Sequence, residues 1–138
     1  MLNSFNGIDK IRILDKDIIC VNDKVISYGK AFKYPKVDVN SFQLFPPKEQ
    51  RAVDDRYSKD KNNVYYNGEI IKNADVNTYA PLGFGFGKDT KNAYYENKIL
   101  EGVDSKSFKA TNSKDTGIFM FRDKLGNKFD YYTGKKIN

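Results

Sequence analysis

The residue types that most often do chemistry are nearly absent from this sequence. It contains no histidine, the commonest general base and metal ligand. Its single cysteine, Cys20, lies in the apolar run at residues 18–21 and excludes an internal disulfide. Because a nucleophilic thiol needs a base beside it, we expect Cys20 to be a buried small hydrophobic residue instead.

Carboxylates are the remaining candidates for acid–base chemistry or metal binding. Asp54, Asp55 and Asp60 lie in turn-prone contexts that already explain an aspartate. Carboxylate-catalysed hydrolysis also needs two such groups facing one cleft, which the sequence does not indicate. At Asp15 and Asp17 a calcium loop would need more acidic ligands than the surrounding Lys and Asn residues leave. We therefore predict no catalytic residue, no metal ligand, no cofactor and no enzyme.

Aromatic and basic residues are the better candidates for binding a partner. The formal net charge is +6, from 24 Lys and Arg against 18 Asp and Glu, which favours partners with an acidic surface. Tyrosine rings could stack nucleic-acid bases while lysines contact phosphates, or the same sheet face could bind a protein or a cell-envelope glycan. The candidate binding residues are Tyr66, Tyr95, Tyr132, Lys98 and Lys135.

A tandem repeat must position these side chains. Residues 60–79 recur at residues 89–108 without a gap, a shift of 29. Each unit begins with a polar loop, and β-branched and aromatic residues suited to a strand follow it. Asn67-Gly68 then forms a tight hairpin turn, since both residues accept positive φ. The unit thus predicts strand, loop, strand, tight turn, strand.

Two weaker copies complete the array. Residues 15–26 align with residues 60–71, and the last copy is distorted. We predict one mainly β domain over residues 1–138, an antiparallel β-meander of about four hairpin repeats. The repeats span approximately residues 11–42, 57–80, 82–110 and 113–138.

Each of the first three units ends in an apolar–Asp–x–x–Ser/Thr–aromatic pattern. In the second unit Asp75 suits a helix N-cap, and Ala74 and Tyr79 occupy the two positions of a hydrophobic staple. We therefore predict that a short helical turn closes each unit. The equivalent residues are Val37, Asp38 and Phe42 in the first unit and Val103, Asp104 and Phe108 in the third.

Strand register predicts which side chains form the core. The strict alternation at residues 82–87 predicts a strand in which glycine lets a tyrosine ring lie over the backbone. With a four-residue loop at residues 89–92, Tyr94 falls opposite Gly87. Across the Asn67-Gly68 turn Tyr65 pairs with Ile70, and we expect the face carrying this pair to be the core.

Residues 60–68, Asp-Lys-Asn-Asn-Val-Tyr-Tyr-Asn-Gly, resemble the DKNYY family of bacterial repeat proteins. The resemblance extends over about residues 15 to the end, although the third copy departs from it at Thr90, Lys91 and Asn97. It implies a repeat architecture and brings no catalytic residues. The resemblance also implies relatives that look like cell-envelope or toxin-neighbourhood proteins.

Together these features predict a non-catalytic protein-binding module of a bacterial protein. One specific form is an immunity protein that neutralises a cognate toxin; the alternative is nucleic-acid or envelope-glycan binding. The chain shows neither a signal peptide nor an apolar run long enough to span a membrane. We expect a cytoplasmic protein if the chain is full length, and an envelope or periplasmic one if a leader was removed.

Overall fold

A computed structural model describes residues 11–15, 18–21, 24–27, 30–31, 37–45, 57–112 and 119–137. The described residues form four antiparallel sheets of four strands each and no helix. The strands are β1 (Ile11–Asp15), β2 (Ile18–Val21), β3 (Lys24–Ser27) and β4 (Lys30–Ala31) in sheet 1; β5 (Gln43–Leu44), β6 (Tyr57–Lys59), β7 (Val64–Tyr66) and β8 (Glu69–Ile70) in sheet 2; β9 (Ala80–Gly83), β10 (Phe86–Lys88), β11 (Ala93–Tyr95) and β12 (Lys98–Ile99) in sheet 3; and β13 (Lys109–Asn112), β14 (Phe119–Arg122), β15 (Lys128–Asp130) and β16 (Lys136–Ile137) in sheet 4.

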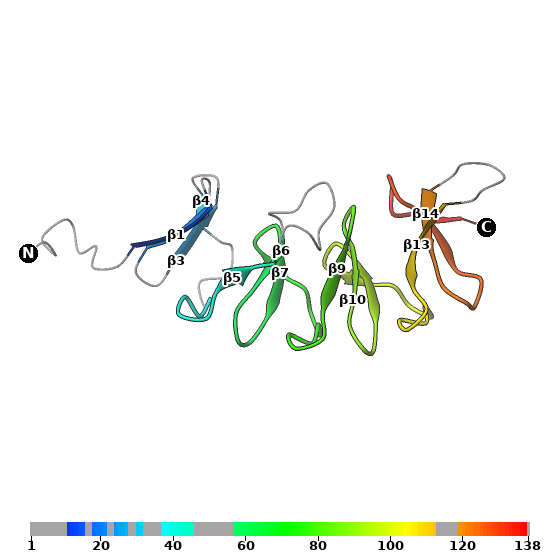
Figure 1. Ribbon diagram of the computed structural model, residues 1–138, viewed down its shortest axis with the longest axis horizontal. Coiled ribbons are helices and arrows are strands. Elements are labelled where there is room, and N and C mark those ends of the chain that lie inside the picture. The colour runs from blue at the N-terminus through cyan, green and yellow to red at the C-terminus, as the bar shows by residue number, and fades with distance from the viewer. Residues whose placement is uncertain are drawn as a thin grey trace, which may run out of the picture.

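The sheets follow one another in sequence order along a row (Figure 1). Within each sheet consecutive strands pair, so every sheet is its own meander. The prediction of a mainly β chain of four antiparallel hairpin units is confirmed. The meander is not continuous, however, because no described strand of one sheet pairs with a strand of the next.

The tight turn of the second unit has the predicted geometry. Tyr66 pairs with Glu69, and the two residues between them have φ values of 52° at Asn67 and 83° at Gly68. Both values lie in the left-handed region that a type I′ turn requires. Gly87 pairs with Tyr94, also as predicted.

Residues 82–87 form a hairpin and not the single strand that we predict from their alternation. β9 ends at Gly83 and β10 begins at Phe86, so the chain reverses at Phe84 and Gly85. The φ values of Gly83, Phe84 and Gly85 are 94°, 56° and 87°. The glycines therefore supply a backbone turn, a role that period-two alternation does not reveal.

The closing segments are isolated turns and the described residues hold no helix, so the predicted short helical turns are not supported. After Asp75 the hydrogen bonds from Thr78 N (3.2 Å) and Tyr79 N (2.9 Å) to the Asp75 carbonyl close a turn that is not continued. The next strand begins at Ala80, which leaves no residues for a second turn. The cap-like contact exists all the same, because Asn77 N donates to the Asp75 carboxylate (3.2 Å).

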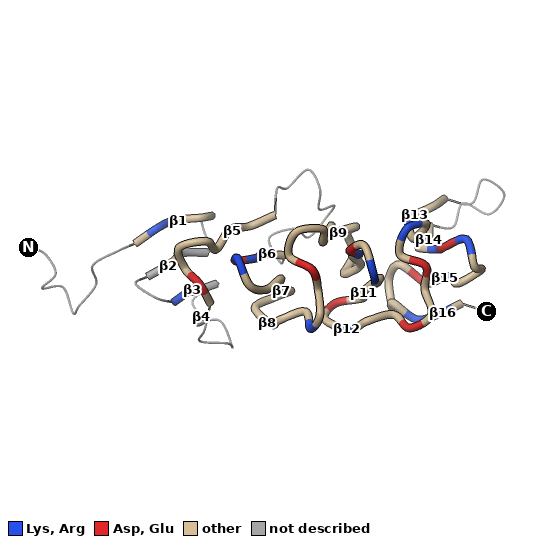
Figure 2. Tube along the Cα trace, turned by 90° about the horizontal axis from the view of Figure 1, so that it is seen from below, with Lys and Arg blue, Asp and Glu red and all other residues tan. Residues whose placement is uncertain are grey.

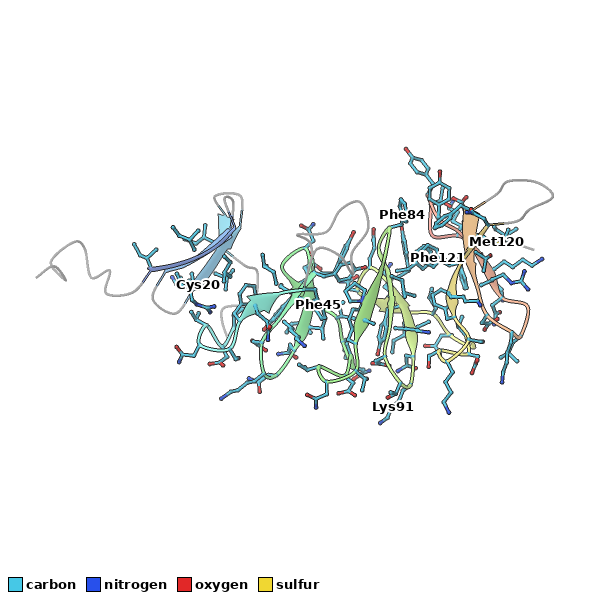
Figure 3. The ribbon with its side chains drawn as sticks, viewed as in Figure 1. Cys20, Phe45, Phe84, Lys91, Met120 and Phe121 are labelled. Atoms are coloured by element: carbon cyan, nitrogen blue, oxygen red, sulfur yellow. The ribbon has the colours of Figure 1, made fainter. Side chains whose placement is uncertain are left out.

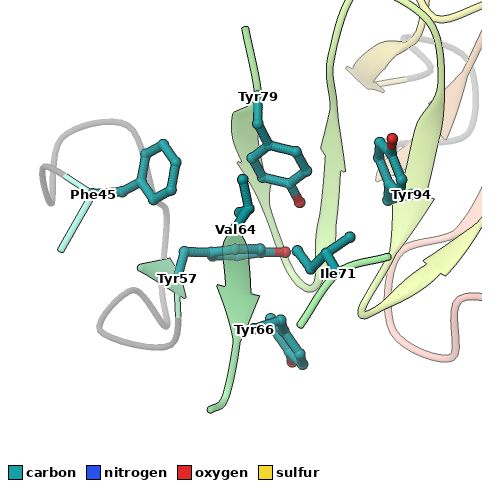
Figure 4. Close-up of a cluster of buried hydrophobic side chains, with 7 residues drawn as sticks. All are labelled: Phe45, Tyr57, Val64, Tyr66, Ile71, Tyr79 and Tyr94. Atoms are coloured by element: carbon teal, nitrogen blue, oxygen red, sulfur yellow. The ribbon is translucent and has the colours of Figure 1, made fainter. Parts of the chain in front are cut away.

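Among the described residues, the core consists of three clusters, each between consecutive sheets. Tyr65, on the predicted core face, packs with Cys20 and Phe42 between sheets 1 and 2. Val64 and Ile71, on the opposite face, are equally buried in the cluster between sheets 2 and 3 (Figure 4). The predicted face is therefore core, and the opposite face is core as well, because stacking covers both faces of sheet 2. The third cluster joins sheets 3 and 4 and is built from Phe86, Ala93, Phe108, Phe121 and Phe129.

Candidate interaction surface

The aspartate that opens each long loop is buried and fully engaged. One carboxylate oxygen of Asp89 accepts the backbone N–H groups of Lys91 (2.9 Å) and Asn92 (2.7 Å). The other accepts the hydroxyl of Tyr94 (2.7 Å) and the backbone N–H of Asp75 (2.9 Å). Asp60, which sequence analysis considered as a catalytic carboxylate, binds Asn62 N, Asn63 N, Tyr65 Oη and Asp38 N in the same way.

These contacts join one sheet to the next. The N–H of Asp75 belongs to the segment that closes sheet 2, whereas Asp89 lies in the long loop of sheet 3. A second bond runs parallel to it, since Thr90 N donates to the hydroxyl of Thr78 (3.2 Å). We call this pair of contacts the aspartate latch. It recurs as Asp38 N to Asp60 with Lys61 N to Ser41 Oγ, and as Asp104 N to Asp123 with Lys124 N to Ser107 Oγ.

The hydrogen bonds that these buried carboxylates accept favour their ionised form. Burial alone would raise the pKa of Asp60 and of Asp89, but the hydrogen bonds that each receives outweigh burial and lower it. In sheet 4 the residue at the position of Tyr94 is Phe129, which has no hydroxyl to donate. The side-chain amide of Asn127 donates to Asp123 in its place (2.8 Å). An anion that already accepts four hydrogen bonds has little capacity left to act as a base.

The structure separates the five candidate binding residues into buried and exposed members. Tyr66 is buried, with its ring centroid 5.1 Å from that of Tyr57. Tyr95 is half-buried and packs on Phe86 (4.7 Å) and across Gly134, where an added Cβ would lie 2.3 Å from its ring. These rings contact neighbouring side chains and backbone in the array.

Three candidates are exposed: Lys98, Lys135 and Tyr132. Lys98 pairs with Tyr95 in the β11–β12 hairpin. Lys135 follows Gly134, whose backbone lies against the ring of Tyr95. The structure thus brings Tyr95, Lys98 and Lys135 to one junction between sheets 3 and 4. Tyr132 lies in the same turn as Lys135 and is 81% exposed.

The position of Tyr132 differs from the one that the repeat alignment gives it. Aligning Thr133-Gly134 with Asn67-Gly68 places Tyr132 at the strand position of Tyr66. In the structure β15 ends at Asp130, and Asp130 N bonds Lys135 O across a longer turn (2.9 Å). Tyr132 therefore sits in the turn, which is why its ring faces solvent.

Sequence analysis missed a group of three rings beside this turn. Phe84, Phe119 and Tyr131 contact one another edge to face, with centroids 5.2–5.5 Å apart. Figure 3 shows Phe84 at the tip of the β9–β10 hairpin, next to sheet 4. Tyr131 also contacts Tyr132 (6.3 Å). The Gly-Phe-Gly sequence was the available signal, because a turn between glycines projects the ring of Phe84 beyond its own sheet.

The described part of sheet 4 and its loops is strongly basic (Figure 2). It holds six cations and two carboxylates, and both carboxylates accept hydrogen bonds within turns. The Thr133 hydroxyl, with its backbone N–H, lowers the pKa of Asp130. The cations are Lys109, Arg122, Lys124, Lys128, Lys135 and Lys136; the carboxylates are Asp123 and Asp130.

The described residues do not bring three Cys, Asp or Glu side chains together where a metal ion could bind.

Cys20 is buried as expected, and burial raises the pKa of its thiol although a guanidinium nitrogen of Arg12 lies 3.8 Å from the sulfur. The part of the chain that the structure describes also holds no helix able to cross a bilayer.

These features define a class of protein: a β-repeat array, without helix in its described residues, whose units are joined by buried aspartates. The family model described as "DKNYY family" matches residues 2–84, and the chain belongs to that family. The matched segment includes sheets 1 and 2 and β9 of sheet 3. No curated protein and no solved structure matches the chain.

Proposed function

We propose that this chain is a non-catalytic protein-binding module that binds an acidic surface of another protein through sheet 4. The carrying observation is that the ring of Tyr132 is exposed in a sheet whose described residues carry six cations and two carboxylates. Tyrosine is enriched at the energetic centres of interfaces, and basic side chains around it speed association with an acidic partner. Tyr132 would be the anchor, with Lys135 beside it.

The carboxylates support a binding role over a catalytic one. The buried carboxylates of Asp60 and Asp89 accept hydrogen bonds from their own loops and from the preceding sheet. Those hydrogen bonds account for their burial and for their lowered pKa. Their arrangement is therefore explained by folding.

Affinity capture from the native organism tests the proposal. The wild-type chain, Tyr132→Ala and Lys135→Glu would serve as separate baits, with Leu125→Ala as the control. Leu125 is an exposed apolar residue of another sheet 4 loop. We expect one acidic protein to be enriched on wild type and control and lost on both test variants. A partner retained equally by all four baits, or none above background, would refute the proposal.

A more specific form of the same proposal is an immunity protein. It rests on the toxin neighbourhoods implied by the family resemblance and on the excess of cations in sheet 4, which also carries Tyr132. If a toxin gene adjoins this one, co-expression of the wild-type chain should restore growth of cells producing that toxin. Tyr132→Ala should not restore it.

Single-stranded nucleic acid is the second candidate, because an exposed ring among lysines also suits base stacking and phosphate contacts. Such binding weakens steeply with salt. An oligothymidylate titration monitored by fluorescence anisotropy separates the two candidates. Salt-sensitive binding lost in Tyr132→Ala would favour nucleic acid, and no binding at low salt would exclude it.

A further inference from the structure

The outer face of sheet 1 is apolar and exposed. Ile11 and Ile13 are 61% and 73% exposed, although both are aliphatic strand residues. In the ladder Ile11 pairs with Val21, Ile13 pairs with Ile19, and Ile19 pairs with Ile26. Directly paired residues share a face of an antiparallel sheet. Among the residues whose side chains the structure describes, Ile11, Ile13, Lys24 and Ile26 occupy this face, and three of the four are aliphatic.

The same face is a stacking surface elsewhere in the array. By strand register Ile11 corresponds to Tyr57, because Ile11 pairs with Val21 as Tyr57 pairs with Tyr66, and by the repeat alignment Ile26 corresponds to Ile71. In sheet 2 both residues are fully buried in the cluster shared with sheet 3. Sheet 1 thus exposes a type of face that sheet 2 covers with another sheet.

Sheet 1 is reversed relative to sheet 2. Cys20 and Val25 align with Tyr65 and Ile70, yet all four residues belong to one cluster. Sheets 1 and 2 therefore meet through equivalent faces, whereas sheets 2 and 3 meet through different ones. Face-to-face packing of equivalent surfaces is already used within this chain.

The outer face of sheet 4 has the opposite character. Lys109, Arg122 and Lys128 are paired across its ladder, and the alternate positions Ala110, Phe121 and Phe129 contribute to the cluster shared with sheet 3. Charged side chains of this kind normally remain exposed to water. Sheet 4 has this surface and sheet 1 lacks it.

We infer that the outer face of sheet 1 is an interface between two copies of this chain, related by two-fold symmetry. An aliphatic face complements a second identical face, and two-fold pairing uses the same patch on both copies. Pairing continues the stack of sheets by the kind of contact that joins sheets 1 and 2. On the described part of this face an acidic partner would have one positive charge to bind, that of Lys24. A second copy of the same aliphatic face therefore fits the surface better.

Sedimentation equilibrium of the full chain tests this inference over a wide concentration range. We expect wild type to reach a species of twice the 15.9 kDa chain mass. Ile13→Glu should weaken dimerisation at least tenfold, because charge burial at the interface is costly. The matched control is Leu125→Glu, since Leu125 is 64% exposed but lies in a loop of sheet 4; it should dimerise like wild type.

Each outcome decides the inference. A wild-type chain that is monomeric at millimolar concentration overturns it, as does a dimer equally strong in Ile13→Glu. Larger open assemblies overturn the two-fold arrangement. Circular dichroism checks that the variants fold, and Ile11→Ser, a milder change on the same face, replaces Ile13→Glu if that variant does not. Because Tyr132 lies on sheet 4, failure here leaves the proposed partner binding to its own test.

Discussion

The loop aspartates show how a residue's neighbours determine its role. Asp60 has the type and loop position of a catalytic carboxylate, and the structure gives it four hydrogen-bond donors. Two donors come from its own loop, one from the tyrosine of its own strand and one from the preceding sheet. The Asp and first Tyr of the family motif are therefore parts of one contact, because the tyrosine hydroxyl and a backbone N–H from the preceding sheet donate to the same carboxylate oxygen.

Neutralising one loop aspartate should destabilise the array. In Asp89→Asn the amide replaces an anionic acceptor while four donors remain in place. Hydrogen bonds to charged groups contribute more than neutral ones, so we expect a loss of about 3 kcal/mol in the free energy of unfolding. Urea denaturation measures it. Glu101→Gln, at an exposed position, is the control. An equal, small effect of both substitutions would contradict a stabilising role for the latch.

Stability should also fall in acid. The pKa values of Asp60, Asp89 and Asp123 are lowered in the folded chain, because hydrogen bonds outweigh the burial that opposes ionisation. The unfolded value is about 3.9. The stabilisation is therefore complete above about pH 5 and is lost as pH falls through the folded pKa values. Urea midpoints between pH 7 and pH 2 should decline at the acidic end, and less steeply in Asp89→Asn. A midpoint that is independent of pH would refute this.

At the scale of elements, glycines are placed where rings cross the backbone. A Cβ at Gly87 would lie 2.0 Å from the hydroxyl oxygen and 2.4 Å from the ring of Tyr79, which is itself buried. The closing segment of sheet 2 thus docks on sheet 3 through a ring that lies directly over a strand.

Gly87→Ala should be one of the most destabilising alanine substitutions in the chain. We expect a loss of about 3 kcal/mol, at the upper end of the usual cost of overpacking, because both ring and strand would have to move. Gly102→Ala is the comparison: its Cβ meets nothing within 4 Å, but its φ of 77° disfavours a side chain and costs about 1 kcal/mol. Thermal unfolding of the two variants ranks them. A smaller loss in Gly87→Ala would show that Tyr79 does not hold its place over the strand.

At this scale the sequence predicts best those features that residues close together in the chain determine. The Asn67-Gly68 turn and the Gly87–Tyr94 register follow from neighbouring residues, and the structure confirms both. The short helical turn expected after Asp75 is not assigned as helix, because the capping residues close one turn and the next strand begins at Ala80. The exposure of Tyr132 depends on the length of a turn that the repeat alignment misplaces.

At the scale of the whole molecule, the fold is a row of sheets, and each described cluster joins one pair of neighbours. The hydrophobic pattern allowed either face of each strand to be core, but it did not indicate which neighbouring sheet would cover each face. That information resides in contacts between units, such as the bond from Asp75 N to Asp89 and the bond from Tyr57 Oη to the Phe86 carbonyl (3.2 Å). Stability should then be approximately a sum over units and their interfaces.

This organisation predicts that damage at one interface stays local. Phe121 is fully buried and stacks on Phe86 with centroids 4.1 Å apart, so Phe121→Ala should cost about 4 kcal/mol. Hydrogen exchange should show lost protection in sheets 3 and 4 and largely retained protection in sheets 1 and 2. Phe42→Ala is the reciprocal variant, because Phe42 packs on Tyr65 between sheets 1 and 2. Its losses should concentrate there. If both variants lowered protection equally in all four sheets, the chain would unfold as one cooperative unit, and the account of a stack held by separable neighbour contacts would be wrong.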